Sequence, residues 1–256
     1  MRAMARVGRG LMAGGLLVFG VQHVLYAGFV ATLVPGWIPG HLFWAYFVGV
    51  AFFAAALGML WDRIVPLAGS MLGVMFLIFV VTTHVPRIAT HLSNGNEWTS
   101  GLVALGMCGG AWVIARRARS EAVETRDALL RIGTCFFGAA MLAFGMLHCV
   151  PARLTMHVGP PWLEGHPVWT YLMGAFLLAA GAAILIGKEL QTAAALLGTM
   201  LLLFFLAVYV PRLIAQPHNP NPWTSGFEIL ALGGAAMVLA KTTTKGAATE
   251  IAKAEA

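Results

Sequence analysis

A small set of histidine, arginine and tryptophan residues occurs twice in this chain at the same spacing, because residues 19–111 recur as residues 144–236 without a gap. These side chains support three kinds of chemistry. Imidazole ligates metals and carries protons, guanidinium binds anions or polarised oxygens, and indole donates one hydrogen bond beside a broad apolar surface. The apolar background differs between the copies, so the retained polar residues are the first candidates for function.

The retained residues fall into four motifs. With their second copies these are FGVQH (19–23) and FGMLH (144–148), PGWIPGH (35–41) and PPWLEGH (160–166), VPR (85–87 and 210–212), and NEWTSG (96–101) and NPWTSG (221–226). Our candidate binding set is His41 and His166, Arg87 and Arg212, Trp98 and Trp223, and Thr99 and Thr224. A guanidinium beside the free N–H groups at a helix start makes a site for an anion or a polarised oxygen. A quinone carbonyl is one such oxygen.

His23 and His148 allow a different reading. Two equivalent histidines could face each other across a twofold axis and ligate one haem or metal ion. That arrangement requires the two segments that carry them to be central. His84 and His91 are not retained, since Tyr209 and Gln216 stand at their positions in the second copy. Haem or metal binding is therefore the alternative, with quinone or lipid as the favoured ligand.

The composition shows what must position these residues. Hydrophobic residues make up 59% of the 256-residue chain and charged residues 10%, whereas a soluble domain carries about 25% charged residues. A bilayer span needs about 20 mostly apolar residues. We predict four spans per half, at 9–29, 42–61, 65–86 and 99–116, and at 133–151, 167–187, 190–211 and 224–241. The fold class is all-α integral membrane, with eight transmembrane helices.

Charge predicts the orientation. If the termini, the 62–64 turn, the 117–132 segment and the 188–189 turn share one side, that side holds 13 of the 16 Lys and Arg residues. The other side holds Arg87, Arg153 and Arg212. This asymmetry predicts a multi-pass membrane protein with both termini cytoplasmic. Anionic lipid head groups account for the net charge of +6, so no nucleic-acid partner is expected.

An even number of spans per half gives both halves the same orientation. They would then be related by a pseudo-twofold axis along the membrane normal. We predict a first four-helix repeat at 1–116, a charged cytoplasmic linker at 117–132, a second repeat at 133–241 and a cytoplasmic tail at 242–256. The basic, apolar N-terminus resembles a signal peptide. The same segment recurs at 133–151, which favours a retained span.

Each retained residue also has a purely structural reading. The tryptophans suit an interfacial aromatic belt. Thr99 and Thr224 suit the N-caps of the fourth spans. Pro86 and Pro211 suit the ends of the third spans. A lone membrane histidine is often a hydrogen-bonded packing residue. The three cysteines are not retained and form no CxxC pair, so we interpret them as packing residues.

The arginines are harder to explain structurally, because they lie on the side with few positive charges. Snorkelling to lipid head groups is one explanation. No retained carboxylate faces them, since Pro222 stands where Glu97 stands in the first copy. We therefore expect Arg87 and Arg212 to bind backbone carbonyls, lipid phosphate or a ligand.

The FGxxH, VPR and NxWTSG motifs, with the Trp44, Tyr46 and Gly49 pattern and its second copy, resemble the DoxX-like superfamily of small bacterial membrane proteins. Members typically have four helices. The resemblance covers each half separately and implies a tandem fusion of two such units. The superfamily is linked to respiratory and redox contexts, including subunits of thiosulfate:quinone oxidoreductase. This resemblance implies an accessory or quinone-side role in a bacterial inner membrane.

Four functions remain open on this reading. The favoured one is a redox-associated accessory protein that binds a quinone or lipid at its extracytoplasmic face. The second is a structural subunit of a larger respiratory or photosynthetic membrane complex. The third is a histidine-ligated haem or metal protein, and the fourth is a transporter, against which the spans carry few charged residues. We assign no catalytic residue. The expected partners are membrane lipids, a quinone or other membrane subunits.

Overall fold

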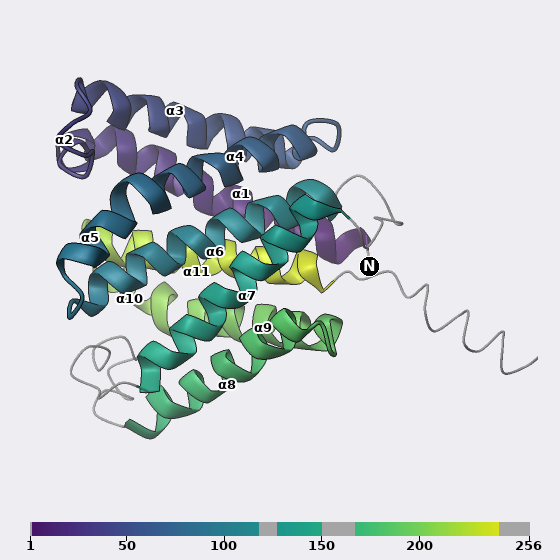
Figure 1. The fold of residues 1–256 in the computed structure, drawn as a ribbon. Helices are drawn as coiled ribbons and strands as arrows, with labels where there is room; N and C mark the ends of the chain where they lie inside the picture. Colours follow the sequence, from purple (N-terminus) through teal and green to yellow (C-terminus); the bar gives the residue numbers. More distant parts are fainter. Residues whose placement is uncertain (1, 118–126, 150–166, 241–256) are drawn as a thin grey trace, which may run out of the picture.

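The computed structural model describes residues 2–117, 127–149 and 167–240, which form a bundle of long helices that run between two ends (Figure 1). Within these residues there are helices and turns but no strand. The helices are α1 (Arg2–Leu25), α2 (Ala27–Ala31), α3 (His41–Leu60), α4 (Val65–Phe79), η1 (Val80–His84), α5 (Val85–Thr90), α6 (Gly95–Arg117), α7 (Ala128–Cys149), α8 (Pro167–Ile186), α9 (Leu190–Phe204), η2 (Phe205–Tyr209), α10 (Val210–Ala215) and α11 (Pro220–Leu239). The all-α prediction is confirmed for this part of the chain.

Seven helical stretches among the described residues are long and apolar enough to cross a membrane. They correspond to the first seven predicted spans. In two of them an α-helix, a π-helical turn and a second α-helix run on without a break, giving single stretches Val65–Thr90 and Leu190–Ala215. The eighth predicted span corresponds to α11, which is 20 residues long. Its first turns carry Pro, Asn, Trp, Thr and Ser, and Glu228 follows, so it is less apolar than the others.

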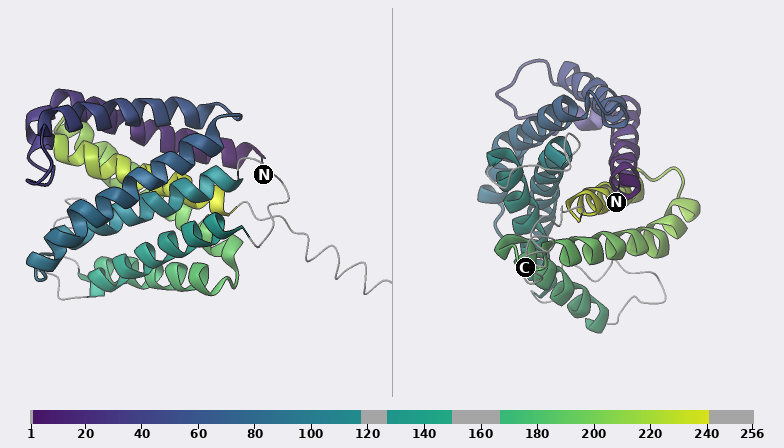
Figure 2. Two further views of the ribbon diagram at one scale, coloured as in Figure 1. Left: turned by 45° about the horizontal axis from the view of Figure 1, so that its top comes forward. Right: turned by 90° about the vertical axis from the view of Figure 1, so that its right-hand side faces the viewer.

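The helices pack as a closed ring when viewed along the bundle (Figure 2). Around the ring the order is α1, α3, α4, α6, α7, α8, α9 and α11, and α11 packs again on α1. Helices α6 and α11 also pack against each other across the centre. The first long helix of each half thus packs on the last long helix of the other half. The two halves therefore share one continuous interior.

Glycines allow the closest of these contacts. A Cβ built on Gly109 of α6 would lie 2.5 Å from the carbonyl oxygen of Gly133 on α7. A Cβ on Gly234 of α11 would lie 2.3 Å from the carbonyl oxygen of Gly8 on α1. Backbones this close gain dispersion contacts that larger side chains would prevent, which is the usual way in which membrane helices associate.

The third span of each half does not end at its proline, contrary to the sequence-based prediction. The helix continues through Pro86 to Thr90 and through Pro211 to Ala215. Proline interrupts a regular α-helix because it lacks an N–H and its ring meets the carbonyl of residue i−4. A π-helical turn lies directly before each proline-containing turn. Its extra residue moves the carbonyls out of register with the proline ring, so the helix can continue.

The last helix of each half begins earlier than predicted, and its cap is an asparagine. Helix α6 begins at Gly95 and α11 at Pro220, so Thr99 and Thr224 are not N-caps. The side chain of Asn219 caps α11 by accepting a hydrogen bond from the Asn221 N–H at 3.1 Å. Asn94 accepts from the Asn96 N–H at 3.0 Å in the same way. The asparagine side chain satisfies an N–H that has no acceptor within the helix.

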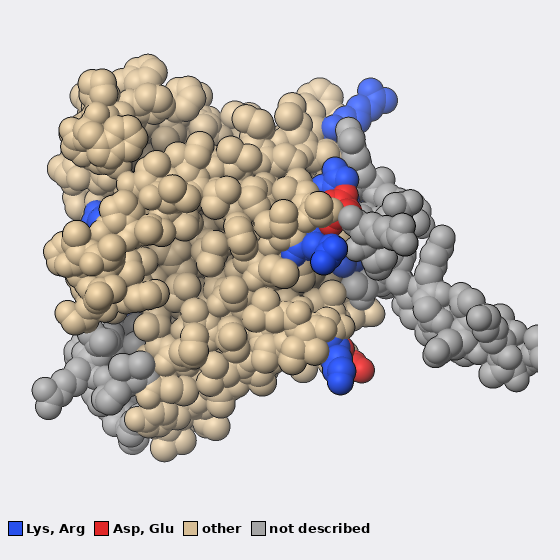
Figure 3. All heavy atoms as spheres, in the orientation of Figure 1, with Lys and Arg blue, Asp and Glu red and all other residues tan. Residues whose placement is uncertain are grey.

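Charged residues gather at one end of the bundle (Figure 3). We call this the basic end, because α1 begins there with Arg6 and Arg9, and α6 ends there with Arg116 and Arg117. The opposite end, which carries α2, α5 and α10, is the α5 end (Figure 1). Its described basic residues are Arg87 and Arg212, besides histidines. The charge asymmetry read from the sequence therefore corresponds to two opposite ends of the molecule.

Candidate functional site at the α5 end

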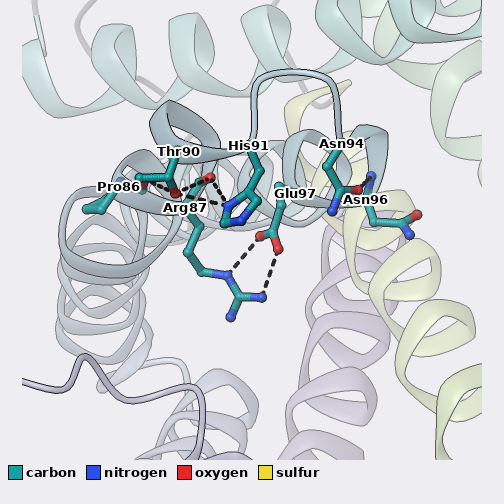
Figure 4. Close-up of polar contacts among 7 residues, drawn as sticks. All are labelled: Pro86, Arg87, Thr90, His91, Asn94, Asn96 and Glu97. Atoms are coloured by element: carbon teal, nitrogen blue, oxygen red, sulfur yellow. Dashed lines mark hydrogen bonds and ion pairs between the residues drawn. The ribbon is translucent and has the colours of Figure 1, made fainter.

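Arg87 lies in the α5 helix and forms a two-pronged ion pair with Glu97 in the first turn of α6 (Figure 4). Its Nε donates to Glu97 Oε2 at 2.9 Å, and its Nη2 donates to Oε1 at 2.8 Å. The carboxylate oxygens match the planar guanidinium fork, which is the strongest geometry for such a pair. The Arg87 side chain is 44% exposed, whereas that of Glu97 is 14% exposed.

We expected Arg87 to bind backbone carbonyls, lipid phosphate or a ligand. In the structure its partner is the Glu97 carboxylate. Glu97 neutralises it, although the second copy has Pro222 at that position. The third guanidinium nitrogen, Nη1, makes no hydrogen bond with another described residue and points away from Glu97 in Figure 4. Arg87 is thus oriented by one partner and still presents free N–H donors.

Two histidines surround the pair. His91 follows α5, and its ring Nδ1 lies 3.2 Å from the carbonyl oxygen of Arg87, which orders the helix end. His84 belongs to the π-helical turn and packs against α6 at Gly101, where an added Cβ would lie 3.3 Å from the His84 Cβ. Its buried Nδ1 has no hydrogen-bond partner among the described residues. The two imidazoles therefore lie on the same segment as Arg87, one before it and one after it.

The equivalent place in the second half is built from different residues. Tyr209 replaces His84 and packs against Gly226, the counterpart of Gly101. The guanidinium carbon of Arg212 lies 6.0 Å from the centroid of the Tyr209 ring, within the range of a cation–π interaction. The two retained arginines thus have different surroundings. The repeat had shown both replacements, Tyr209 for His84 and Pro222 for Glu97, but not that these residues contact the arginines.

The retained tryptophans hold the turns that connect the third and fourth long helices of each half. Trp98 Nε1 donates to the carbonyl oxygen of Leu92 at 3.0 Å, and Trp223 Nε1 donates to that of Pro217 at 3.0 Å. Each bond spans six residues, so the indole closes the turn as a cross-link would. Trp223 also stacks on Phe227, with ring centroids 5.7 Å apart. A structural role accounts for both indole N–H groups.

The hydroxyl groups of the two retained threonines donate hydrogen bonds to carbonyl oxygens of their own helices. Thr99 Oγ1 donates to the Gly95 carbonyl at 2.9 Å. Thr224 Oγ1 lies 3.1 Å from the Pro220 carbonyl and 3.0 Å from Oε1 of Gln22 on α1. Only the second threonine therefore takes part in a contact between the two halves.

His41 begins α3, as predicted, but it is not part of the arginine cluster. Helix α5 packs against η1 and α6. Helix α3 packs against α1, α2 and α4, and it lies away from α5 in Figure 1. His166 lies outside the described residues. Among the candidate set, the structure brings Arg87 to the start of α6, which carries Trp98 and Thr99, and leaves His41 apart.

His23 and His148 lie in separate helix interfaces. His23 Nδ1 is 2.8 Å from its own helix carbonyl at Phe19, and His148 Nδ1 is 2.7 Å from that at Phe144. His23 packs against Gly49 of α3, whereas His148 packs against Gly174 of α8. The two rings therefore do not face each other across a common axis. Among the described residues no group of three or more His, Cys, Asp or Glu side chains could hold a metal ion.

The cysteines behave differently from one another. Cys108 is buried in the core, which agrees with the prediction of a packing residue. Cys135 and Cys149 are exposed on the bundle surface. All three are free thiols.

Several residues that cap helices or make contacts between helices were not among the candidates chosen from the sequence. Asn94 and Asn219 are retained two positions before the NxWTSG motif, so the repeat could have indicated them. Gln22, Glu97 and Glu228 are not retained, because Leu147, Pro222 and Val103 stand in the other copies. A search for retained residues necessarily passes over them.

Comparison with known proteins gives one match. Residues 12–109 match the model of a domain of unknown function, DUF8561. No curated protein and no solved structure matches the chain.

Proposed function

We propose that this protein is an accessory membrane protein that binds a carbonyl-bearing, lipid-soluble molecule, such as a quinone, at its α5 end. The observation that supports this proposal is the arrangement of Arg87. The guanidinium is held by Glu97 through two hydrogen bonds, and its third nitrogen points away from Glu97 on a side chain that is 44% exposed. A donor oriented in advance loses little entropy when a ligand binds.

The charge of the pair favours a carbonyl over a phosphate. Arg87 and Glu97 together are neutral, and a carboxylate next to the site repels an incoming anion. A neutral carbonyl oxygen accepts from the free guanidinium N–H groups without that repulsion. A quinone or a lipid ester carbonyl therefore fits the site better than a lipid phosphate does. Arg212 would supply the donor of a second site.

We also propose that the two halves are four-helix repeats of the same orientation, that α11 is the eighth span, and that both termini are cytoplasmic in a bacterial inner membrane. Several contacts support the repeat, since the asparagine caps, the indole bonds and the π-helical turns occur in both halves at equivalent positions. The basic end supports the orientation. The resemblance to DoxX-like proteins is compatible with this arrangement.

Quinone titration tests the binding proposal. The purified protein in detergent is titrated with a short-chain benzoquinone, and tryptophan fluorescence reports binding. We expect saturable quenching, with the affinity of the Arg87 site weakened about fivefold in Arg87→Ala, and the affinity of both sites weakened about fivefold when Arg212→Ala is added, because each lost hydrogen bond costs about 1 kcal/mol. Arg63→Ala, at the basic end, is the matched control and should bind as the wild type does.

The Glu97→Gln variant distinguishes between a carbonyl ligand and a phosphate ligand. It leaves the guanidinium positively charged and less firmly oriented. We expect weaker quinone binding together with stronger association with vesicles rich in phosphatidylglycerol. If the double arginine variant binds the quinone like the wild type, the proposed site is wrong.

A structural subunit is the second candidate function. It is favoured by the hydrogen bonds of the retained tryptophans, which hold turns in place and involve no ligand. In that case, the α5 end would be a shaped surface for neighbouring membrane subunits. Stable co-purification of partner subunits in mild detergent, unaffected by the arginine variants, would favour this function over quinone binding.

A further inference from the structure

Glu228 is an acidic residue placed inside the bundle. It is the ninth residue of α11, which puts it about 12 Å along the helix from its start at the α5 end. The first half has Val103 at the equivalent position. A carboxylate among apolar helices is costly unless it is paired or protonated, so such residues in membrane helices usually mark a site.

The position of Glu228 on the helix directs it towards the centre of the ring. Leu232 and Ala235 of α11 face α6, since they contact the Cβ positions of Gly106 and Gly110 at 3.1 Å and 2.6 Å. Glu228 lies four residues before the first and seven before the second, on the same helical stripe. It therefore projects to the interface between α11 and α6, where the two halves meet. The side chain is half-buried there.

Neutral polar side chains lie near Glu228 on α11 and on η2. Thr224 and Ser225, one turn earlier, are its helical neighbours. Tyr209 of η2 packs against α11 at Gly226, one residue after Ser225 and two residues before Glu228. Gln22 of α1 bonds to Thr224 and, through Nε2, to the Pro220 carbonyl at 3.0 Å. The hydroxyl oxygens still have lone pairs to offer as acceptors.

No ion pair of Glu228 is found in the part of the chain that the structure describes, although the Arg212 guanidinium carbon lies 6.0 Å from the centroid of the Tyr209 ring. The ion pairs found there join Arg9 to Asp62, Arg87 to Glu97 and Arg116 to Asp127, and none includes Glu228. Burial among apolar helices favours the neutral form of a lone carboxyl group, whereas a bound cation favours the carboxylate. The carboxylate and the neutral oxygens together suit one small positive charge. Hard alkali cations and ammonium N–H groups both prefer such oxygens.

We propose that Glu228, with Thr224, Ser225 and Tyr209, forms a binding site for a small monovalent cation, either an alkali ion or a primary ammonium group, at the interface of the two halves. This site lies on the α6-facing side of α11 and is distinct from the Arg87–Glu97 pair. It does not depend on quinone binding.

Cation-dependent stability tests this site. The thermal unfolding midpoint of the full-length protein in detergent is measured with sodium, potassium or methylammonium chloride, and N-methylglucamine chloride keeps the ionic strength constant. We expect at least one probe to raise the midpoint in a saturable manner, as a ligand of the folded state does. A response to sodium or potassium identifies an alkali site, whereas a response to methylammonium alone identifies an ammonium site.

Glu228→Gln should lose the saturable response, because it keeps the shape and removes the charge. Glu189→Gln, at the turn before α9, should retain it. Should Glu228→Gln fail to fold, Glu228→Asp must raise the half-saturating concentration at least threefold, because the shorter side chain moves the carboxylate. A wild-type protein with no saturable response, or a Glu228→Gln variant that responds unchanged, would overturn the proposal.

Discussion

At the scale of single residues, most retained polar side chains of the α5 end bind their own backbone. Trp98 and Trp223 close turns, Asn94 and Asn219 cap helices, and Thr99 bonds one turn back. Their retention in both halves is explained by these local bonds. Arg87 differs, because its partner is a side chain from another helix and part of its donor capacity remains free.

Replacement of Trp98 by Phe tests the local role of the indole. Phenylalanine keeps the aromatic bulk but leaves the Leu92 carbonyl without its donor. We expect the free energy of unfolding to fall by about 0.5–1 kcal/mol, at the lower end for a hydrogen bond because water can reach the exposed turn. Thermal unfolding in detergent measures it. Trp37→Phe is the control, since Trp37 is 73% exposed, and an equal loss there would contradict the role.

Asp127 gives a prediction on pH. Its hydrogen bond with Arg116 lowers the pKa of this carboxyl below its usual value. Its Oδ1 also accepts from the Leu130 N–H at 3.0 Å, as an N-cap of α7. Because the pKa is lower in the folded state, the ionised pair stabilises the protein fully at neutral pH. That contribution is lost below about pH 4, the ordinary value for Asp, as the pH falls through the folded-state pKa.

The stability of the Asp127→Asn variant should depend less on acid pH than that of the wild type. Asparagine keeps the cap and removes the charge, so its unfolding midpoint should lie below that of the wild type at pH 7 and approach it near pH 3. Asp127→Ala should lose about 1 kcal/mol more at every pH, because the cap is lost too. Parallel wild-type and Asp127→Asn profiles from pH 7 to 3 would contradict the role of the ion pair.

At the scale of helices, two features determine the arrangement: close packing at glycines, and π-helical turns that interrupt the α-helices. Gly109 and Gly133 let α6 and α7 approach until backbone meets backbone. The π-helical turn at Val80–His84 lets a helix pass through Pro86 and carry Arg87 beyond it. Had the helix ended at the proline, Arg87 would lie in a loop. The helix instead places it opposite the first turn of α6.

Gly109→Ala tests the helix contact. The added methyl would lie 2.5 Å from both the Gly133 carbonyl oxygen and the Phe137 nitrogen, and backbone atoms cannot rotate away. We expect a loss of about 1–3 kcal/mol in the free energy of unfolding, measured by thermal unfolding in detergent. Gly14→Ala is the control. Its Cβ would meet nothing within 4 Å, so it should be neutral or stabilising by up to about 1 kcal/mol.

At the scale of the whole molecule, the ring of helices joins the first helix to the last. Helix α1 begins and α11 ends at the basic end (Figure 2). The hydrogen bonds of Gln22 to Pro220 and Thr224 tie these two helices together, although they are about as far apart in the chain as two helices can be. The equivalent pair, α6 and α7, is consecutive in the chain.

Reporter fusions at the two termini test the count of spans. If α11 crosses the membrane, both termini lie on the same side, and the basic end predicts the cytoplasm. Green fluorescent protein fused at either terminus should then fluoresce, and alkaline phosphatase should be inactive at both. If the termini report opposite sides, α11 does not cross and the eight-helix arrangement is incorrect.

The sequence by itself determined the helical class, the approximate position of each long helix and the charge difference between the two ends. These properties follow from composition and local periodicity, which act over about 20 residues. The repeat also located the turns at the α5 end, because the same local bonds need the same residues in both halves.

Only the tertiary structure showed which helix faces meet. It paired Arg87 with Glu97, joined Gln22 to Thr224, set His23 and His148 in separate interfaces, and placed Glu228 in register with the α11 residues that face α6. Each of these depends on the rotation and the approach of two packed helices. A residue that forms such a contact, such as Gln22 or Glu97, need not occur in both halves, because the contact itself occurs only once. Retention therefore indicates the local bonds, whereas the interactions between helices require the packed bundle.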